Sequence, residues 1–138
     1  MQQKGTPMNN NGISEESFGD YLRCKREERH ITLRGMAEIL GISAPYLTDV
    51  ERNRKNPPSI DKLEQIRDTL NLTKEEYAYM MNLAGKSRNS VAPDLPDYIM
   101  GRDYVSAALR TARDMGAGKE EWDKFVAMLL EKSTKTDM

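Results

Sequence analysis

The sequence predicts an all-α protein with five short helices in one domain, followed by a C-terminal helical hairpin. Three observations lead to this fold class. Apolar residues recur at the three- and four-residue spacing of amphipathic helices, as in Leu33, Met36, Ala37 and Leu40. Ser, Thr, Gly and Pro residues mark where these runs begin and end. The chain also lacks a clear run of alternating apolar and polar residues, the pattern of a half-buried strand.

Composition and Pro residues divide the chain into segments. The polar start is rich in Gln, Asn and Gly and has no apolar periodicity, which predicts disorder. The segment containing Pro93 and Pro96 breaks any helix and predicts a linker. The expected segments are a disordered tail at residues 1–13, a first domain at 14–85, a linker at 86–97, a helical extension at 98–132 and a tail at 133–138.

The first predicted helix begins at Ser14 or Ser17, because either side chain can cap it, and it ends near His30. Phe18 and Leu22 lie four residues apart and are expected to face the core. We interpret His30 as the residue that ends the helix rather than as a catalytic group. This interpretation rests on the tolerance of His for a left-handed backbone.

Two further predicted helices are separated by only three residues. Thr32 caps the first of them and Gly41 ends it, while Ser43 caps the second, which runs from about Ala44 to Arg52. Two helices joined in this way form a helix-turn-helix.

Two more helices complete the predicted first domain. Ser59 is expected to cap a helix that continues to Leu70. Thr73 and Glu76 have the spacing of a capping box, which predicts the start of a fifth helix.

The predicted C-terminal hairpin ends in a strongly apolar helix. Apolar residues at helical spacing occupy residues 105–115, a turn containing Gly116 and Gly118 follows, and the last helix begins at Glu120. Its apolar stripe consists of Trp122, Phe125, Val126, Leu129 and Leu130. This stripe is compatible with core packing against the first domain, with dimerisation, or with binding of another protein.

The composition argues against several classes of protein. The 138 residues carry 21 basic and 22 acidic side chains, and this balance argues against binding nucleic acid or a membrane by bulk charge. One His and one Cys cannot supply a zinc site or a His-based triad, and we expect no enzyme activity, no metal and no cofactor. Without a signal peptide or a run of about 18 apolar residues, the sequence predicts a cytoplasmic protein that does not bind membranes.

The helix-turn-helix region carries a specific motif. Residues 40–52 read Leu-Gly-Ile-Ser-x-x-Tyr-Leu-x-x-x-Glu-Arg. With its flanking residues, this stretch resembles the Xre family of phage-repressor and Cro-like regulators over about residues 16–85. The resemblance implies a five-helix DNA-binding domain whose third helix enters the major groove and whose second helix begins over the phosphate backbone. It also implies an ion pair between Arg26 and Glu51 that holds the third helix against the first.

On this resemblance, two sets of side chains are expected to face DNA. Those facing the bases are Ala44, Pro45, Thr48, Asp49 and Arg52. Those facing phosphates are Arg34, Ser43, Tyr46, Asn53, Arg54 and Lys55. The first set is poor in hydrogen-bonding groups, because Ala44 and Pro45 offer only apolar contacts, for example to thymine methyl groups. Asp49 is expected either to accept a hydrogen bond from a cytosine amino group or to pair with Arg52.

Charge is sorted along the chain in agreement with this assignment. Residues 17–56 carry eight basic and six acidic side chains, so the remainder is acidic. Arg52, Arg54 and Lys55 cluster directly after the third helix, where phosphate contacts are expected. Lys25 and Arg29 are interpreted as solvated surface charges.

Two functions from different classes follow from these features. The first is a transcriptional repressor that binds operator DNA as a homodimer, on half-sites about 34 Å apart. The second is an antitoxin- or inhibitor-type protein whose C-terminal hairpin binds a partner protein, with the helix-turn-helix serving autoregulation. The chain resembles small Xre regulators of Gram-positive bacteria, which implies a toxin or a metallopeptidase as such a partner.

Overall fold

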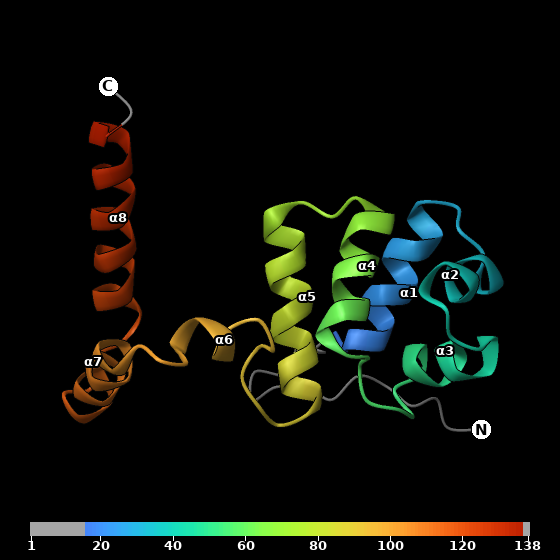
Figure 1. The fold of residues 1–138 in the computed structure, drawn as a ribbon, viewed down its shortest axis with the longest axis horizontal. Coiled ribbons are helices and arrows are strands. Elements are labelled where there is room, and N and C mark those ends of the chain that lie inside the picture. Colours follow the sequence, from blue (N-terminus) through green and yellow to red (C-terminus); the bar gives the residue numbers. More distant parts are fainter. Residues whose placement is uncertain (1–15, 137–138) are drawn as a thin grey trace. The chain divides into compact units, whose positions relative to one another are not determined.

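The computed structural model describes residues 16–136, and α-helices are the regular secondary structure of this part of the chain (Figure 1). The predicted all-α class is therefore confirmed. The described chain divides into two compact units at Pro96 and Asp97. The predicted tail at residues 1–13, the alternative cap Ser14 and the last two residues lie outside the described part.

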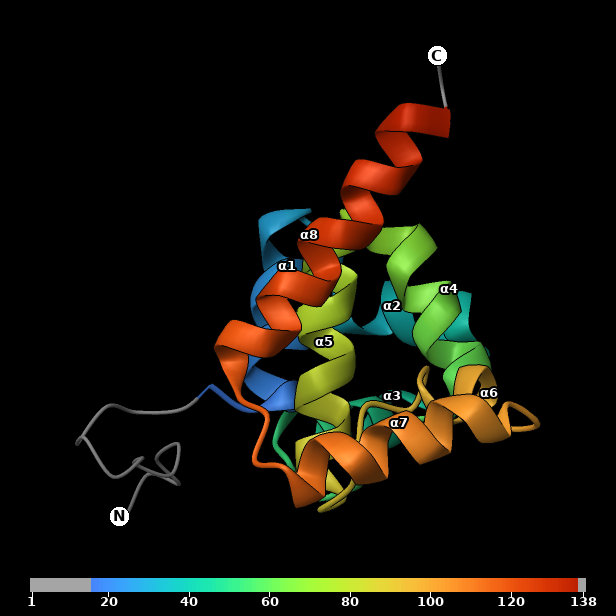
Figure 2. The same ribbon diagram turned by 90° about the vertical axis from the view of Figure 1, so that its left-hand side faces the viewer.

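The first unit contains five helices that enclose one hydrophobic core. Their bounds are α1 (Phe18–Glu28), α2 (Leu33–Leu40), α3 (Ala44–Glu51), α4 (Ile60–Leu70) and α5 (Lys74–Ser87). Helix α1 packs against both α3 and α5, and α2 packs against α3 and α4 (Figures 1 and 2). The core contains the predicted apolar stripes, including Leu22, Met36, Leu40, Leu47, Val50, Leu63, Ile66, Leu70, Met80 and Met81.

Capping side chains set the starts of these helices. Ser17, Thr32 and Ser43 each accept a hydrogen bond from the backbone N–H three residues further on, at 3.0–3.2 Å. Both bonds of the predicted Thr73–Glu76 capping box are present. Ser59 occupies the N-cap position of α4 without a side-chain hydrogen bond of this kind.

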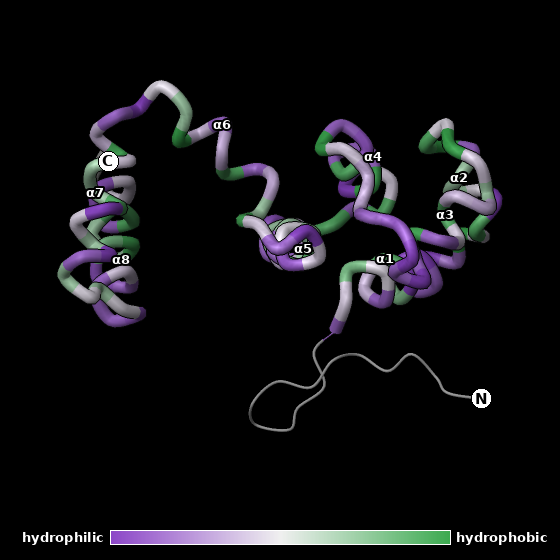
Figure 3. The backbone as a smooth tube through the Cα atoms, turned by 90° about the horizontal axis from the view of Figure 1, so that it is seen from below, coloured by the Kyte–Doolittle hydropathy of each residue, from purple (hydrophilic) through white to green (hydrophobic). Residues whose placement is uncertain are grey.

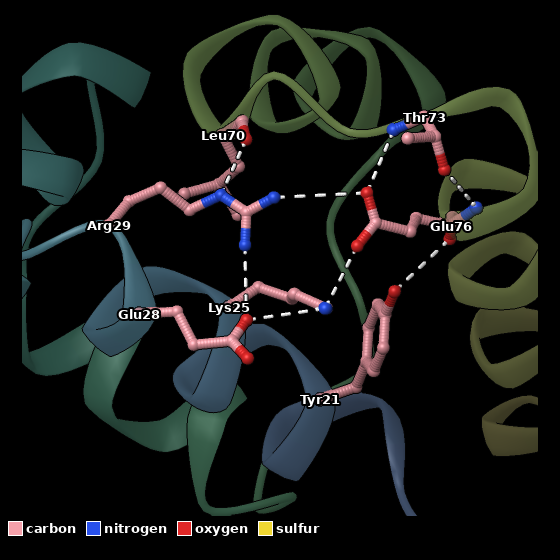
Figure 4. Close-up of polar contacts among 7 residues, drawn as sticks. All are labelled: Tyr21, Lys25, Glu28, Arg29, Leu70, Thr73 and Glu76. Atoms are coloured by element: carbon pink, nitrogen blue, oxygen red, sulfur yellow. Dashed lines mark hydrogen bonds and ion pairs between the residues drawn. The ribbon is translucent and has the colours of Figure 1, made fainter.

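A network of ion pairs joins α1 to α5 (Figure 4). Lys25 Nζ lies 2.9 Å from a Glu76 carboxylate oxygen and 3.2 Å from Glu28. Arg29 donates to the Leu70 carbonyl at 2.7 Å, and its guanidinium lies 3.8 Å from Glu76. The interpretation of Lys25 and Arg29 as solvated surface charges was therefore wrong, because both connect α1 to the segment where α4 ends and α5 begins.

The same network stabilises the charged form of Glu76. The Thr73 backbone N–H donates to its carboxylate at 2.9 Å, and Lys25 lies on the other side. Together these contacts lower the pKa of Glu76 to about 2, with the Thr73 hydrogen bond as the largest cause. The Glu76 carboxylate in turn raises the pKa of Lys25.

The segment expected to be a linker packs against the first unit for part of its length. Arg88 donates to the Pro57 carbonyl, and Ala92 is buried in the core. Gly85 permits this packing, since a Cβ atom at this position would lie 2.5 Å from the Val91 carbonyl. Residues 86 and 87 form the end of α5, and residues 88–95 form a strap over the unit.

The second unit contains α7 (Asp103–Asp114) and α8 (Lys119–Thr136), preceded by the short α6 (Pro96–Ile99). The turn between α7 and α8 includes Gly116, whose φ of 72° is readily adopted by glycine. The two helices leave this turn as an open V rather than lying side by side along their length (Figures 1 and 2). No described residue of this unit is buried.

Two boundaries of the second unit differ from those expected. Helix α6 was not predicted, although Pro96 stands at its first position, which proline favours. Helix α8 continues through residues 133–136, which were expected to form a tail. This stretch contains neither Gly nor Pro, and local sequence does not stop the helix there.

Candidate nucleic-acid interface

The turn between α2 and α3 is built from the three residues that the sequence singled out. Gly41 has a left-handed backbone with φ of 69°, and the Ile42 N–H donates to the Ala37 carbonyl at 3.0 Å. Ser43 then caps α3 through the Tyr46 N–H. These contacts satisfy backbone groups at the end of α2 and at the start of α3, and they set the angle between the two helices.

A buried ion pair fixes α3 against α1. Arg26 Nε donates to Glu51 Oε2 at 2.8 Å and Arg26 Nη2 donates to Oε1 at 3.0 Å, while Nη1 donates to the Ile31 carbonyl at 2.8 Å. Arg26 is 7% exposed and Glu51 3%. The hydrogen-bonded Glu51 carboxylate raises the pKa of Arg26. The pairing implied by the family resemblance is therefore present, and its two parallel bonds fix the orientation of α3.

A second set of contacts, which was not predicted from the sequence, fixes the end of α3 against α1. Asn53 has a left-handed backbone with φ of 63°; its Oδ1 accepts from the Gly19 N–H at 3.0 Å, and its Nδ2 donates to Ser17 Oγ at 2.8 Å. At Gly19, a Cβ atom would lie 2.3 Å from the Glu51 carbonyl oxygen. The Asn53 side chain, expected at a phosphate, thus holds the start of α1 against the end of α3.

Four basic side chains remain exposed around the helix-turn-helix. Arg34 lies in the first turn of α2, and Arg52, Arg54 and Lys55 follow α3 directly. The Arg54 and Lys55 N–H groups both donate to the Asp49 carbonyl, at 2.8 and 3.3 Å, and this holds the cluster in a tight turn.

The outward face of α3 carries the residues expected to face bases. Pro45 is exposed, and Ala44, Thr48 and Asp49 are half-buried. The Thr48 hydroxyl donates to the Ala44 carbonyl at 3.0 Å. The Asp49 carboxylate lies 3.8 Å from Arg54 Nη1, so the neighbouring arginine that it meets is Arg54, whereas the sequence suggested Arg52.

The remaining expected phosphate contacts have mixed surroundings. Ser43 is exposed, but its hydroxyl already accepts the capping hydrogen bond. Tyr46 is half-buried and packs partly against the core. The part of the chain that the structure describes contains no group of three or more His, Cys, Asp or Glu side chains arranged to hold a metal ion. Across residues 16–136, no helix is both long and apolar enough to cross a membrane.

Comparison with known proteins shows which family this chain belongs to. A helix-turn-helix family profile matches residues 22–77. The HTH-type transcriptional regulator DdrOP3 of Deinococcus deserti is 33% identical over 109 residues, covering 75% of this chain and 84% of the relative. The chain belongs to the Xre-like helix-turn-helix family of transcriptional regulators.

Other relatives of this Xre-like chain match a shorter stretch. The HTH-type transcriptional regulator Rv0474 of Mycobacterium tuberculosis is 42% identical over 76 residues, which cover 55% of this chain and 54% of the relative. The chain thus spans about half the length of that relative. Among solved structures, the N-terminal DNA-binding domain of SinR from Bacillus subtilis is 30% identical and covers 44% of this chain and 87% of that one, with a TM-score of 0.39.

Proposed function

We propose that this chain is a transcriptional repressor that binds operator DNA as a homodimer and acts by occlusion, without catalysis. The observation that carries the proposal is the position of Arg34, Arg52, Arg54 and Lys55, all exposed, around an α3 that Arg26 and Glu51 hold in place. In a helix-turn-helix the second helix lies in the major groove, and basic side chains beside it lie within reach of phosphates. Membership of a family of transcriptional regulators supports the same function.

Two further features support the docking of α3 on DNA. The starts of α2 and α3 carry no acidic residue in the first turn, so the backbone N–H groups and the helix dipole there favour an anion. The Arg26–Glu51 and Asn53–Gly19 contacts both hold the C-terminal end of α3 against α1. A preorganised recognition helix loses less conformational entropy on binding. Binding to DNA would place the protein in the bacterial cytoplasm.

The C-terminal unit supplies the proposed dimer surface. The predicted stripe of α8 is exposed, with Trp122 at 39%, Phe125 at 46% and Leu129 at 46%. Trp122 and Phe125 also line an apolar groove of about 500 Å³ between α7 and α8. Hydrophobic and hydrophilic stretches alternate along the backbone of both helices (Figure 3). Large apolar patches of this kind mark interaction surfaces. A second copy of this chain is the occupant we propose, since one helix-turn-helix offers a small DNA contact and two half-sites need two subunits.

The same stripe favours a second candidate function. An antitoxin- or inhibitor-type protein would use the second unit to bind a different protein, such as a toxin or a metallopeptidase, and would keep the helix-turn-helix for autoregulation. The exposed Trp122 and Phe125 support this candidate as well as they support a dimer.

Footprinting of the full chain on genomic DNA from its own promoter region, at two salt concentrations, tests the proposed function. The repressor predicts two protected half-sites about 34 Å apart. Protection should weaken strongly at the higher salt concentration, because phosphate contacts release counterions on binding. A chain that protects no site, but forms a stable complex with another protein through α8, would favour the second candidate.

A further inference from the structure

The first turn of α3 is apolar on the side expected to face bases. Pro45 is exposed and Ala44 is half-buried at the start of the helix. Neither side chain carries a hydrogen-bond donor or acceptor. In a helix-turn-helix these N-terminal residues of the second helix come nearest to the base edges. The part of α3 best placed for direct contact therefore offers methyl and methylene groups.

The polar residues of the next turn are already engaged within the protein. The Thr48 hydroxyl proton is donated to the Ala44 carbonyl at 3.0 Å. The Asp49 carboxylate lies 3.8 Å from the Arg54 guanidinium, and the Asp49 carbonyl accepts from the Arg54 N–H at 2.8 Å. Of the base-facing residues within α3, Pro45 is therefore the exposed one, and Ala44 beside it is half-buried and packs partly against the core. Arg52, the remaining base-facing residue, follows directly after the helix.

We propose that α3 reads the 5-methyl groups of pyrimidines in the major groove through Pro45 and Ala44. The inference rests on the proposed function, because it requires α3 to lie in that groove. The 5-methyl group of thymine is an apolar feature of the major-groove edge. A polar base edge pressed against Pro45 loses water and gains no partner, whereas a methyl group gains by leaving water. Thymine, or 5-methylcytosine, is therefore the base that this surface fits.

Substitution of single methyl groups in DNA tests the proposal. A binding site is first selected with the full chain from a random duplex library. Each thymine of that site is then replaced in turn by uracil, which lacks only the 5-methyl group. We expect at least one position in each half-site where this loss weakens binding about fourfold. This factor corresponds to the free energy gained when one methyl-sized group is buried away from water. Placing 5-methylcytosine rather than cytosine at that position should strengthen binding by a similar factor.

Protein variants show whether the methyl group acts through α3. Pro45→Ala keeps a residue that suits the first turn of a helix but removes most of the apolar ring. At the contacted position, this variant should bring the ratio of thymine to uracil affinity close to one. The matched control is Arg54→Ala with Lys55→Ala. It should weaken binding equally to the site with thymine and to the site with uracil, and so leave the ratio of the two affinities unchanged.

The possible outcomes separate this inference from the proposed function. A chain that selects no DNA site overturns the proposed function and the methyl readout with it. A chain that binds its selected site equally well with uracil at every position overturns the methyl readout alone. A uracil effect that persists unchanged in Pro45→Ala and in Ala44→Gly also overturns it, because the methyl group would then act through DNA shape.

Discussion

Arg26 and Glu51, 25 residues apart in sequence, form a buried ion pair with two parallel hydrogen bonds of 2.8 and 3.0 Å. The pair connects α1 to the last residue of α3, and Arg26 also holds the Ile31 carbonyl before α2. One guanidinium therefore positions both helices of the helix-turn-helix. Removing either partner would leave a charge buried without its counter-ion.

Arg26→Ala should destabilise the first unit by about 3–5 kcal/mol, because the Glu51 carboxylate would stay buried and unpaired. Urea unfolding followed by circular dichroism measures this change in the free energy of unfolding. Arg23→Ala is the matched control, since Arg23 is exposed and lies 3.7 Å from Asp20. It should change stability by less than about 1 kcal/mol. Equal effects of the two variants would refute the structural role of the buried pair.

Asn53 combines a left-handed backbone with two side-chain hydrogen bonds, and two variants separate these contributions. Asn53→Gly keeps the backbone conformation and removes both hydrogen bonds, which should cost about 1–2 kcal/mol. Asn53→Ala removes the same hydrogen bonds and places at φ of 63° a Cβ atom without the short polar side chain that lets Asn adopt this region, so it should be about 1 kcal/mol less stable than Asn53→Gly. Thermal and urea unfolding of both variants check this order. An Asn53→Gly variant as stable as the parent chain would contradict the role of these hydrogen bonds.

The low pKa of Glu76 predicts how the stability of the first unit depends on pH. The pKa of Glu76 is about 2 in the folded chain, below the ordinary value of 4.5. The contribution of its carboxylate to the free energy of unfolding is therefore fully present above pH 4.5 and is lost as the pH falls towards 2. Glu76→Gln should lower the free energy of unfolding by about 1–2 kcal/mol at neutral pH, a modest value because the carboxylate is partly exposed and screened. The difference between Glu76→Gln and the parent chain should narrow steadily between pH 5 and pH 2.

The neighbouring residue Glu75 provides the control for this titration. It is exposed and lies one residue before Glu76 in the first turn of α5. Glu75→Gln should leave the dependence of stability on pH close to that of the parent chain. If Glu75→Gln and Glu76→Gln both differ from the parent chain in stability at neutral pH, and both differences shrink equally as the pH falls, the effect comes from general charge and not from the contacts with Thr73 and Lys25.

Trp122→Ala tests whether the second unit mediates self-association. Trp122 is partly exposed and packs edge-to-face on Phe125 at 6.2 Å between ring centroids. The variant should shift the chain from dimer to monomer in sedimentation equilibrium, while the unfolding transition of the first unit stays unchanged. Lys124→Ala, on the same helix and highly exposed, should leave the dimer intact. Cooperative loss of the whole fold in Trp122→Ala would instead place this side chain in a shared core.

Local sequence predicted the helices of the first unit well because their signals are local. Thr32, Gly41 and Ser43 act within one turn of their own positions, and so does the capping box at Thr73. The apolar stripes of α2 and α4 also needed no long-range information, since a periodic stripe identifies its buried face.

Contacts between distant residues were not predictable in this way. The Asn53–Gly19 hydrogen bond spans 34 residues, and the link from Arg29 to the Leu70 carbonyl spans 41. The residues around Asn53 and Arg29 do not indicate these distant partners. From the sequence, Asn53 was therefore expected to contact a phosphate and Arg29 to face solvent. Arg26 and Glu51 were paired only because the motif resembled a known family. The packing of Ala92 was hidden because Pro and Ser around it are typical of linkers.

The dependence of DNA binding on salt tests the central claim most directly. Arg54→Ala with Lys55→Ala should weaken binding to all DNA sequences and reduce the slope of log affinity against log salt by about 1.8, the value for two lost phosphate contacts. Arg23→Ala with Lys74→Ala removes the same charge from α1 and α5 and should leave the slope unchanged. Equal slopes for the parent chain and both double variants would contradict the placement of α3 and its basic cluster on DNA.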